Sequence, residues 1–140
     1  GVKKIYERLS ELVEDLNLQK FLNKKTGELS SGQKNRVALA KSLINKPKLL
    51  FLDEPTASLD PDVGDFVREY IERYKKNNEL TILLASHNMR EVERLCNKVV
   101  MMKQGEIVDS GTCRELIKKH GRLNLEDTFL KIARSKNELG

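Results

Sequence analysis

The chain has 140 residues, which is enough for one domain of ordinary size with a buried core. Hydrophobic residues make up 39% and charged residues 34%, a mixture that excludes a disordered chain and predicts a folded domain with a heavily charged surface. The net charge is +5, but the basic side chains are interleaved with acidic ones and only 5% of residues are aromatic, so we expect no specific nucleic-acid partner.

The first third of the chain predicts two helices. Over residues 2–18 the apolar residues recur at three- and four-residue spacing, which is typical of an amphipathic helix. A second helix is expected after residues 29–33, and it ends before Pro47 because proline cannot continue the hydrogen-bond ladder. Its expected buried side consists of Val37, Ala38, Ala40, Leu43 and Ile44.

Two unbroken apolar runs, residues 49–52 and 80–85, predict strands that are covered on both faces. Between them Asp60-Pro61 predicts a helix start, with an aspartate cap followed by proline at the first helical position. Strands that alternate with helices predict an α/β fold with a parallel sheet flanked by helices. Beyond the second strand we expect a helix over 89–95, a hairpin that turns at Gln104-Gly105, and helices over 112–119 and 124–133.

Chemically useful side chains follow both predicted strands. Asp53 and Glu54 come directly after the first strand, and His87 follows the second. Ligands gather at the carboxyl ends of parallel strands, so this is a suitable place for handling phosphate. Asp53 could hold Mg²⁺, Glu54 could orient an attacking water, and His87 could donate a hydrogen bond to phosphate charge. Taken singly, each residue also has an ordinary structural explanation.

The segment Leu29-Ser30-Ser31-Gly32-Gln33 at the head of the second helix has two readings. Ser30 or Ser31 could simply cap the helix by accepting a bond from a backbone N–H group. Alternatively, the helix amino end and Gly32 could let backbone N–H groups approach a phosphate closely.

In combination these motifs resemble the ATP-binding subunit of ABC transporters. Residues 29–33 are similar to the signature motif, 49–54 to the Walker B strand, Ser58-Leu59-Asp60 to the D-loop, and Ser86-His87 to the switch histidine. The resemblance implies a partial P-loop NTPase-like sheet. Residues 1–47 would form part of the helical signature region, 48–111 the Walker B core, and 112–140 the carboxy-terminal helices.

The resemblance also implies a role for each matched residue. Asp53 would serve Mg²⁺, Glu54 the attacking water, and His87 the terminal phosphate. The signature residues Ser30, Ser31, Gly32 and Gln33 would face ATP held on a second subunit, with Ser30 and Gly32 touching its terminal phosphate. Asp60 would bridge the two subunits. Ser31 stands where the commonest family pattern has glycine.

The glycine-lysine loop that grips ATP is absent from this sequence. No G-x-x-x-x-G-K-[ST] occurs, and the nearest approach, Lys25-Thr26, lacks the preceding glycines. We therefore expect the isolated chain neither to bind ATP tightly nor to hydrolyse it. The chain would be a fragment of a longer subunit or a natural degenerate protein. An alternative role is a non-catalytic interaction module that completes a partner's ATP site.

Partners and location are expectations of the same kind. The two cysteines are too few for a disulfide framework, which indicates a reducing cytosol, and no apolar run approaches the roughly 18 residues of a membrane helix. The resemblance implies a transmembrane permease partner and a place at the inner face of the cell membrane. Residues 123–131 resemble the end of subunits serving ABC-2 type exporters, although an ordinary terminal helix would show the same apolar pattern.

Overall fold

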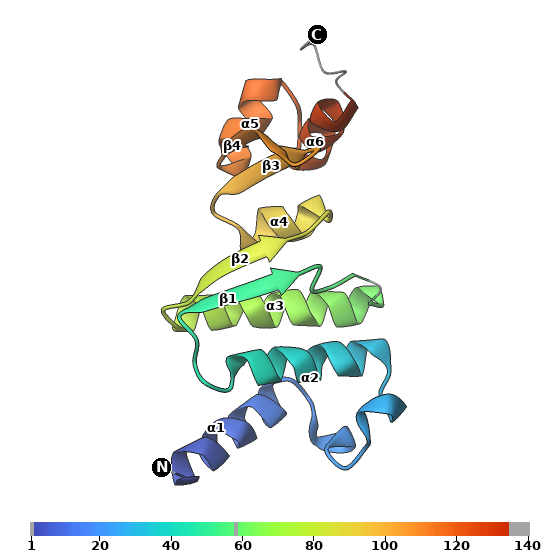
Figure 1. Ribbon diagram of the computed structural model, residues 1–140, viewed down its shortest axis with the longest axis vertical. Coiled ribbons are helices and arrows are strands. Elements are labelled where there is room, and N and C mark those ends of the chain that lie inside the picture. The colour runs from blue at the N-terminus through green and yellow to red at the C-terminus, as the bar shows by residue number, and fades with distance from the viewer. Residues whose placement is uncertain (1, 58, 135–140) are drawn as a thin grey trace. The chain divides into compact units, whose positions relative to one another are not determined.

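The computed structural model describes residues 2–57 and 59–134, which form two compact units, Gly1–Ala85 and Ser86–Gly140 (Figure 1). Each unit combines helices with one pair of strands. The three expected sections, 1–47, 48–111 and 112–140, are defined by motifs and stay predictions.

The first unit pairs two strands in parallel and packs helices beside them. Its strands β1 (Leu49–Asp53) and β2 (Thr81–Ala85) are joined by helix α3 (Pro61–Asn77), which Figure 1 shows running alongside both. In the register of the pair, Leu50 lies opposite Ile82 and Asp53 lies opposite Ala85. Helices α1 (Val2–Asp15) and α2 (Ser31–Leu43) precede the strands, with short 3₁₀ turns at Gln19–Phe21 and Thr26–Glu28. The α/β fold with a parallel sheet and flanking helices is confirmed.

The prediction that both strands are covered on both faces is wrong for this chain. Leu50 is 5% exposed, whereas its neighbours Leu49 and Phe51 are 49% and 67% exposed, and Leu83 on β2 is 60% exposed. Successive side chains of a strand point to opposite faces, so one face of the pair carries the core and the other does not.

Two helix predictions also need correction. Helix α1 ends at Asp15 rather than at residue 18, because Asn17 takes a left-handed conformation with φ of 53°, a common way to end a helix. On α2 the buried residues are Leu39, Ala40 and Leu43, while the expected Ala38 is exposed. Leu39 and Leu43 are one turn apart and share a face, and Ala38 lies about 100° around the helix from Leu39.

Two arginines fasten the helices of the first unit. Arg36 of α2 lies over the rings of Phe21 and Phe66, at 5.4 and 5.9 Å from their centroids, and donates to the carbonyl of Leu16. Arg8 of α1 donates to the carbonyl of Leu43 at 3.1 Å and to the hydroxyl of Tyr74 at 2.9 Å. Helix α2 is therefore bonded to its neighbours near its middle, at Arg36, and at its carboxyl end, at Leu43.

The second unit builds its core from a hairpin and three helices. It contains α4 (Met89–Leu95), β3 (Val99–Lys103), β4 (Glu106–Gly111), α5 (Cys113–His120) and α6 (Leu125–Arg134). The buried cluster consists of Met89, Val92, Met101, Leu116 and Leu125. The strands are antiparallel and are joined by Gln104-Gly105, both with positive φ, as a two-residue hairpin turn requires. The predicted hairpin is confirmed.

The remaining sequence expectations concern sulfur chemistry and membranes. Neither Cys96 nor Cys113 forms a disulfide within the described residues, and burial raises the pKa of Cys113. Within the parts of the chain that the structure describes, no helix combines the length and the apolar character needed to cross a bilayer.

Candidate nucleotide site

An acidic pair lies at the carboxyl end of the parallel strands. Asp53 is the last residue of β1 and is exposed, and Glu54 follows it, half-buried. The Glu54 N–H donates to the carbonyl of Ala85 at 2.8 Å, so the residue after β1 is bonded to the last residue of β2. The two strand ends therefore meet at one edge, where side chains can converge on a ligand.

Glu54 has an unusual backbone conformation. Its φ is +46°, in the left-handed region that costs a residue with a Cβ roughly 1–2 kcal/mol. Such a conformation persists only when neighbouring contacts hold it, and the Ala57 N–H donates to the Glu54 carbonyl at 3.1 Å. Strain of this kind clusters at functional sites, where a side chain must be aimed in a direction that relaxed backbone does not give.

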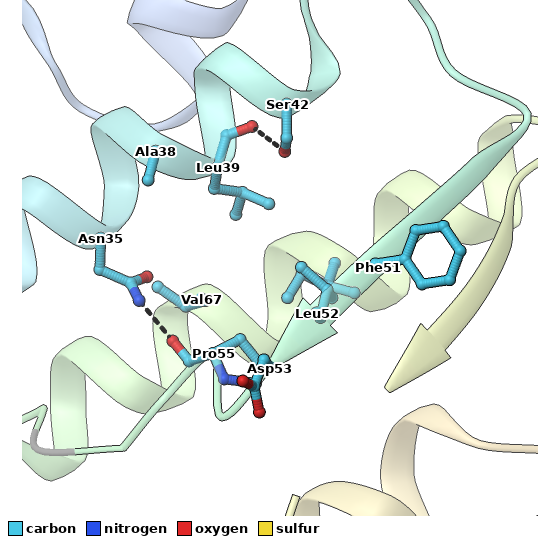
Figure 2. Close-up of a pocket in the computed structure, with 10 residues that line it drawn as sticks. Asn35, Ala38, Leu39, Ser42, Phe51, Leu52, Asp53, Pro55 and Val67 are labelled. Carbon is cyan, nitrogen blue, oxygen red and sulfur yellow. Dashed lines mark hydrogen bonds between the residues drawn. The ribbon is translucent and has the colours of Figure 1, made fainter. Parts of the chain in front are cut away.

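The loop after Glu54 is fastened by side chains from two helices. Asn35 of α2 donates from its amide to the carbonyl of Pro55 at 2.6 Å, as the dashed line in Figure 2 shows. Arg68 of α3 donates to the hydroxyl of Thr56 at 3.2 Å, and Thr56 is buried.

These loop-fastening residues were missed by the sequence reasoning. Asn35 did carry a signal, since it lies three residues after Gly32 and four before the buried Leu39, which puts a polar side chain on an inward helix face. Thr56 and Arg68 carried none, because their pairing depends on how α3 packs.

The signature segment forms the amino end of α2, and there the capping interpretation is realised. Ser30 is the N-cap; its hydroxyl accepts from the Gln33 N–H at 3.3 Å, and the Gln33 side-chain oxygen accepts from the Ser30 N–H at 3.1 Å. A serine hydroxyl has one donor and two acceptor positions, so the cap leaves the Ser30 O–H proton available for a phosphate oxygen. Capping and anion binding are therefore compatible.

Gly32 and its neighbours are shaped by close packing. A Cβ on Gly32 would lie 3.1 Å from Cγ1 of Val63 at the start of α3, so α2 and α3 approach closely there. Leu29 is buried and anchors the segment, whereas Ser30 and Ser31 are exposed. The polar signature side chains thus lie on the surface while Leu29 and Gly32 hold the backbone beneath them.

The prediction that the Asp60 side chain caps α3 is wrong. Asp60 occupies the N-cap position with Pro61 after it, but its carboxylate makes no cap hydrogen bond. Pro61 has no N–H group, and the exposed first turn can be satisfied by water. The carboxylate therefore faces solvent at the end of the expected D-loop. Ser58 of that motif lies outside the described residues.

Comparison with known proteins shows what this chain is similar to. Residues 4–57 match the ABC transporter family. A methionine import ATP-binding protein from Staphylococcus aureus is 32% identical over 126 residues, which cover 90% of this chain and 37% of that protein. In sequence and in fold, the chain matches the ATP-binding domain of ABC transporters.

Solved structures have a similar fold over most of this chain. An ATP-binding subunit of an ABC transporter superposes on 94% of this chain and 55% of its own, with a TM-score of 0.81 and 24% identity. A dimeric ATP-binding cassette in a post-hydrolysis state, bound to ADP and Pi, covers 76% of this chain and 46% of its own, with a TM-score of 0.69 and 26% identity. This chain spans about a third of the length of the curated relatives it matches.

The donor set fits the cofactors that an ABC ATP-binding domain implies. Mg²⁺ in nucleotide sites is held by one or two carboxylates together with phosphate oxygens, and Asp53 offers an exposed carboxylate at the strand end. The described residues contain no cluster of three or more potential ligands that could hold a metal without such phosphates.

One pocket borders this site but does not fit ATP. It has a volume of about 200 Å³, below the roughly 300 Å³ at which ligand pockets begin. Figure 2 shows residues of α2, β1 and α3 that line it, among them Asn35, Asp53 and Val67. His87 is the second residue of the second unit, two positions beyond Ala85, and stays a predicted partner of Glu54.

Proposed function

We propose that this chain is the carboxy-terminal portion of the ATP-hydrolysing subunit of an ABC transporter, which couples ATP hydrolysis to movement of a substrate across a membrane. One observation carries the proposal. The strained Glu54 lies at the carboxyl end of parallel β1, and the loop after it is bonded to the helix that begins with the signature segment.

In this proposal each side chain acts on a phosphate or on water. Glu54 orients and deprotonates the attacking water, which requires a carboxylate held in one direction. His87 donates a hydrogen bond to the terminal phosphate, and Asp53 holds Mg²⁺. When bound, Mg²⁺ neutralises charge on the phosphate oxygens.

A second subunit completes the site in the same proposal. Ser30, Ser31, Gly32 and Gln33 present the amino end of α2 to ATP held on that subunit, where backbone N–H groups and the helix dipole favour negative charge. Asp60, whose carboxylate faces solvent, bridges to the partner. The dimeric ATP-binding cassette among the similar structures supports this arrangement.

Tight ATP binding also needs a glycine-lysine loop, which these 140 residues do not contain. Such a loop supplies several charge-assisted bonds of roughly 1.5–3 kcal/mol each, so a site without three of them is weaker by about 5 kcal/mol or more. We therefore place turnover in an assembly where another segment supplies this loop.

The permease partner would decide cargo and direction. Residues 123–131 resemble the end of ABC-2 exporter subunits, whereas the curated relative is named for methionine import. In either case the chain would lie at the inner face of the membrane through its permease. Reconstitution with an export permease and with an import permease distinguishes the two directions of transport. The direction of ATP-dependent flux is the measurement.

The test of ATP turnover joins the chain to the amino-terminal half of an ABC ATP-binding domain, which carries the glycine-lysine loop. The fusion should hydrolyse ATP, and Glu54→Gln should lower kcat by about 100-fold or more, because a general base contributes that much. The unfused chain is the control, and calorimetric titration with Mg-ATP should show no low-micromolar binding. A fusion whose kcat is unchanged by Glu54→Gln would contradict the proposed role.

A non-catalytic module is the second candidate, and the exposed, hydrogen-bonded cap at Ser30 on the amino end of α2 is the observation that favours it. In that case the signature segment would complete a partner's ATP site without hydrolysis at Glu54. A fusion that binds ATP but stays inactive, while the chain stimulates a partner subunit, would support this role.

A further inference from the structure

The bond between Asn35 and Pro55 joins two parts of the site that serve different nucleotides. Asn35 lies in the first turns of α2, two residues after Gln33 of the signature segment. Pro55 directly follows Glu54, and its carbonyl accepts the Asn35 amide at 2.6 Å. In the proposed dimer the signature faces ATP on the partner, whereas Glu54 serves ATP on its own subunit.

The backbone at Glu54 needs external support. Its left-handed φ of +46° is unfavourable for a residue with a Cβ, so the bonds around it must hold it in place. The Glu54 N–H is bonded to Ala85, and the Ala57 N–H to the Glu54 carbonyl, both through the main chain. The Asn35 bond is different, because it comes from a side chain of α2 and therefore transmits the position of that helix.

Packing makes this link stiff. The amino end of α2 lies close to the start of α3 at Gly32, where a Cβ would lie 3.1 Å from Cγ1 of Val63. Pro55 is buried, and the same loop is held at Thr56 by Arg68 of α3. A movement of the signature segment is thus passed to the Glu54 loop through short contacts rather than absorbed by flexible side chains.

We propose that Asn35 is a positioning residue that couples the signature segment to Glu54 within one subunit, so that engagement of the partner's ATP adjusts the aim of the catalytic carboxylate. The inference rests on the proposed function for its catalytic part. Its structural part, support of the Glu54 conformation by Asn35, stands on the hydrogen bond alone.

The structural part is tested on the 140-residue chain by amide hydrogen exchange. Asn35→Ala removes the donor, and Asn35→Asp keeps the shape but replaces the donor with an acceptor. Both should raise exchange at the Glu54 and Ala57 amides about three- to tenfold, the effect of one lost hydrogen bond. The Thr81 amide, which donates to Lys48 at 2.9 Å, serves as the internal reference.

Ser42→Ala is the matched control. Ser42 lies on the same helix and lines the same pocket, but its hydroxyl donates only to Leu39 of its own helix at 2.7 Å (Figure 2). It should leave all three amides unchanged. Unchanged exchange at Glu54 in Asn35→Ala, or an equal rise at Thr81, would overturn the inference.

The catalytic part is tested in mixed dimers of the fusion in which only one subunit keeps Glu54. Asn35→Ala in that same subunit should lower kcat about three- to tenfold with little change in KM for ATP. In the opposite subunit it should change kcat less than about twofold. An equal or larger effect from the opposite subunit, or a raised KM alone, assigns Asn35 to the signature contact and overturns the coupling. A fusion without turnover contradicts the proposed function instead, while the exchange result still decides the support of Glu54.

Discussion

Helices α2 and α5 begin with the same capping arrangement, but one is neutral and the other is charged. At α2 the cap joins Ser30 and Gln33, with bonds of 3.3 and 3.1 Å. At α5 it joins Thr112 and Glu115, with bonds of 3.2 and 2.8 Å. The bond from the Thr112 N–H to the Glu115 carboxylate holds the pKa of Glu115 below its ordinary value.

The difference between the two caps concerns charge rather than geometry. A carboxylate in the first turn interacts favourably with the helix dipole, so α5 has the more usual stabilising choice. Gln33 gives α2 the same hydrogen bonds without negative charge. A helix end that receives a phosphate needs an uncharged side chain at this position, because a carboxylate there would repel the ligand.

The largest effect is expected when the side chains of the two caps are exchanged. Gln33→Glu should keep the cap and the stability of α2, yet raise KM for ATP in the fusion at least about tenfold, since like charges a few ångströms apart cost over 1 kcal/mol even when partly solvated. Steady-state turnover against ATP concentration measures it.

Glu115→Gln is the matched exchange at the other helix and should leave KM unchanged. If Gln33→Glu leaves KM for ATP unchanged, the amino end of α2 does not face a phosphate. A large drop in thermal stability would instead show that the Gln33 cap depends on more than its side-chain oxygen.

The sequence predicted the elements of both regions well because their signals are local. Apolar periodicity located α3, the pair Gln104-Gly105 located the hairpin turn, and Ser30 and Thr112 mark two helix starts. It failed where the outcome depends on tertiary packing. The exposed face of β1 at Phe51, and the Asp60 carboxylate that makes no cap bond, follow from which elements lie nearby.

The sequence predicted where the candidate site residues lie on the fold, but not the contacts that hold them. The motif spacing indicated Asp53 and Glu54 at a strand end, and the parallel pairing of β1 and β2 agrees with that placement. The positive φ of Glu54 has no signature in the sequence. The position of Asn35 indicates an inward helix face, but it does not indicate the Pro55 carbonyl that Asn35 binds, twenty residues along the chain. The roles of all the candidate site residues stay predictions: Ser30, Ser31, Gly32, Gln33, Asp53, Glu54, Asp60 and His87.

Removing either capping hydroxyl should have a smaller effect, on the free energy of unfolding. Ser30→Ala and Thr112→Ala should each lower the free energy of unfolding by about 1 kcal/mol, the usual cost of losing an N-cap. Urea unfolding followed by circular dichroism measures both. Only Ser30→Ala should also reduce turnover of the fusion. Equal losses of turnover in the two variants would show that the signature serine matters as a cap alone.

The smallest expected effect concerns the carboxyl end of α5, which charged side chains hold to β4. Lys119 donates to Asp109 of β4 at 2.8 Å, and His120 contacts the other oxygen of that carboxylate at 2.6 Å. These two hydrogen bonds, that of Lys119 first, lower the pKa of Asp109 from 3.8 to about 2. Because the folded state binds this proton more weakly, the stabilisation is complete above pH 3.8 and is lost as the pH falls through about 2.

Asp109→Asn should therefore lower the free energy of unfolding by about 0.5–1 kcal/mol near pH 6, given that Lys119 is largely exposed. Urea unfolding at pH 6 and at pH 2 should show the difference from the parent chain shrinking at the lower pH. Glu79→Gln, an exposed carboxylate in the first unit, should show a much smaller difference at both. A cost of Asp109→Asn that stays constant down to pH 2 would mean that its shape, and not its charge, fastens α5 to the hairpin.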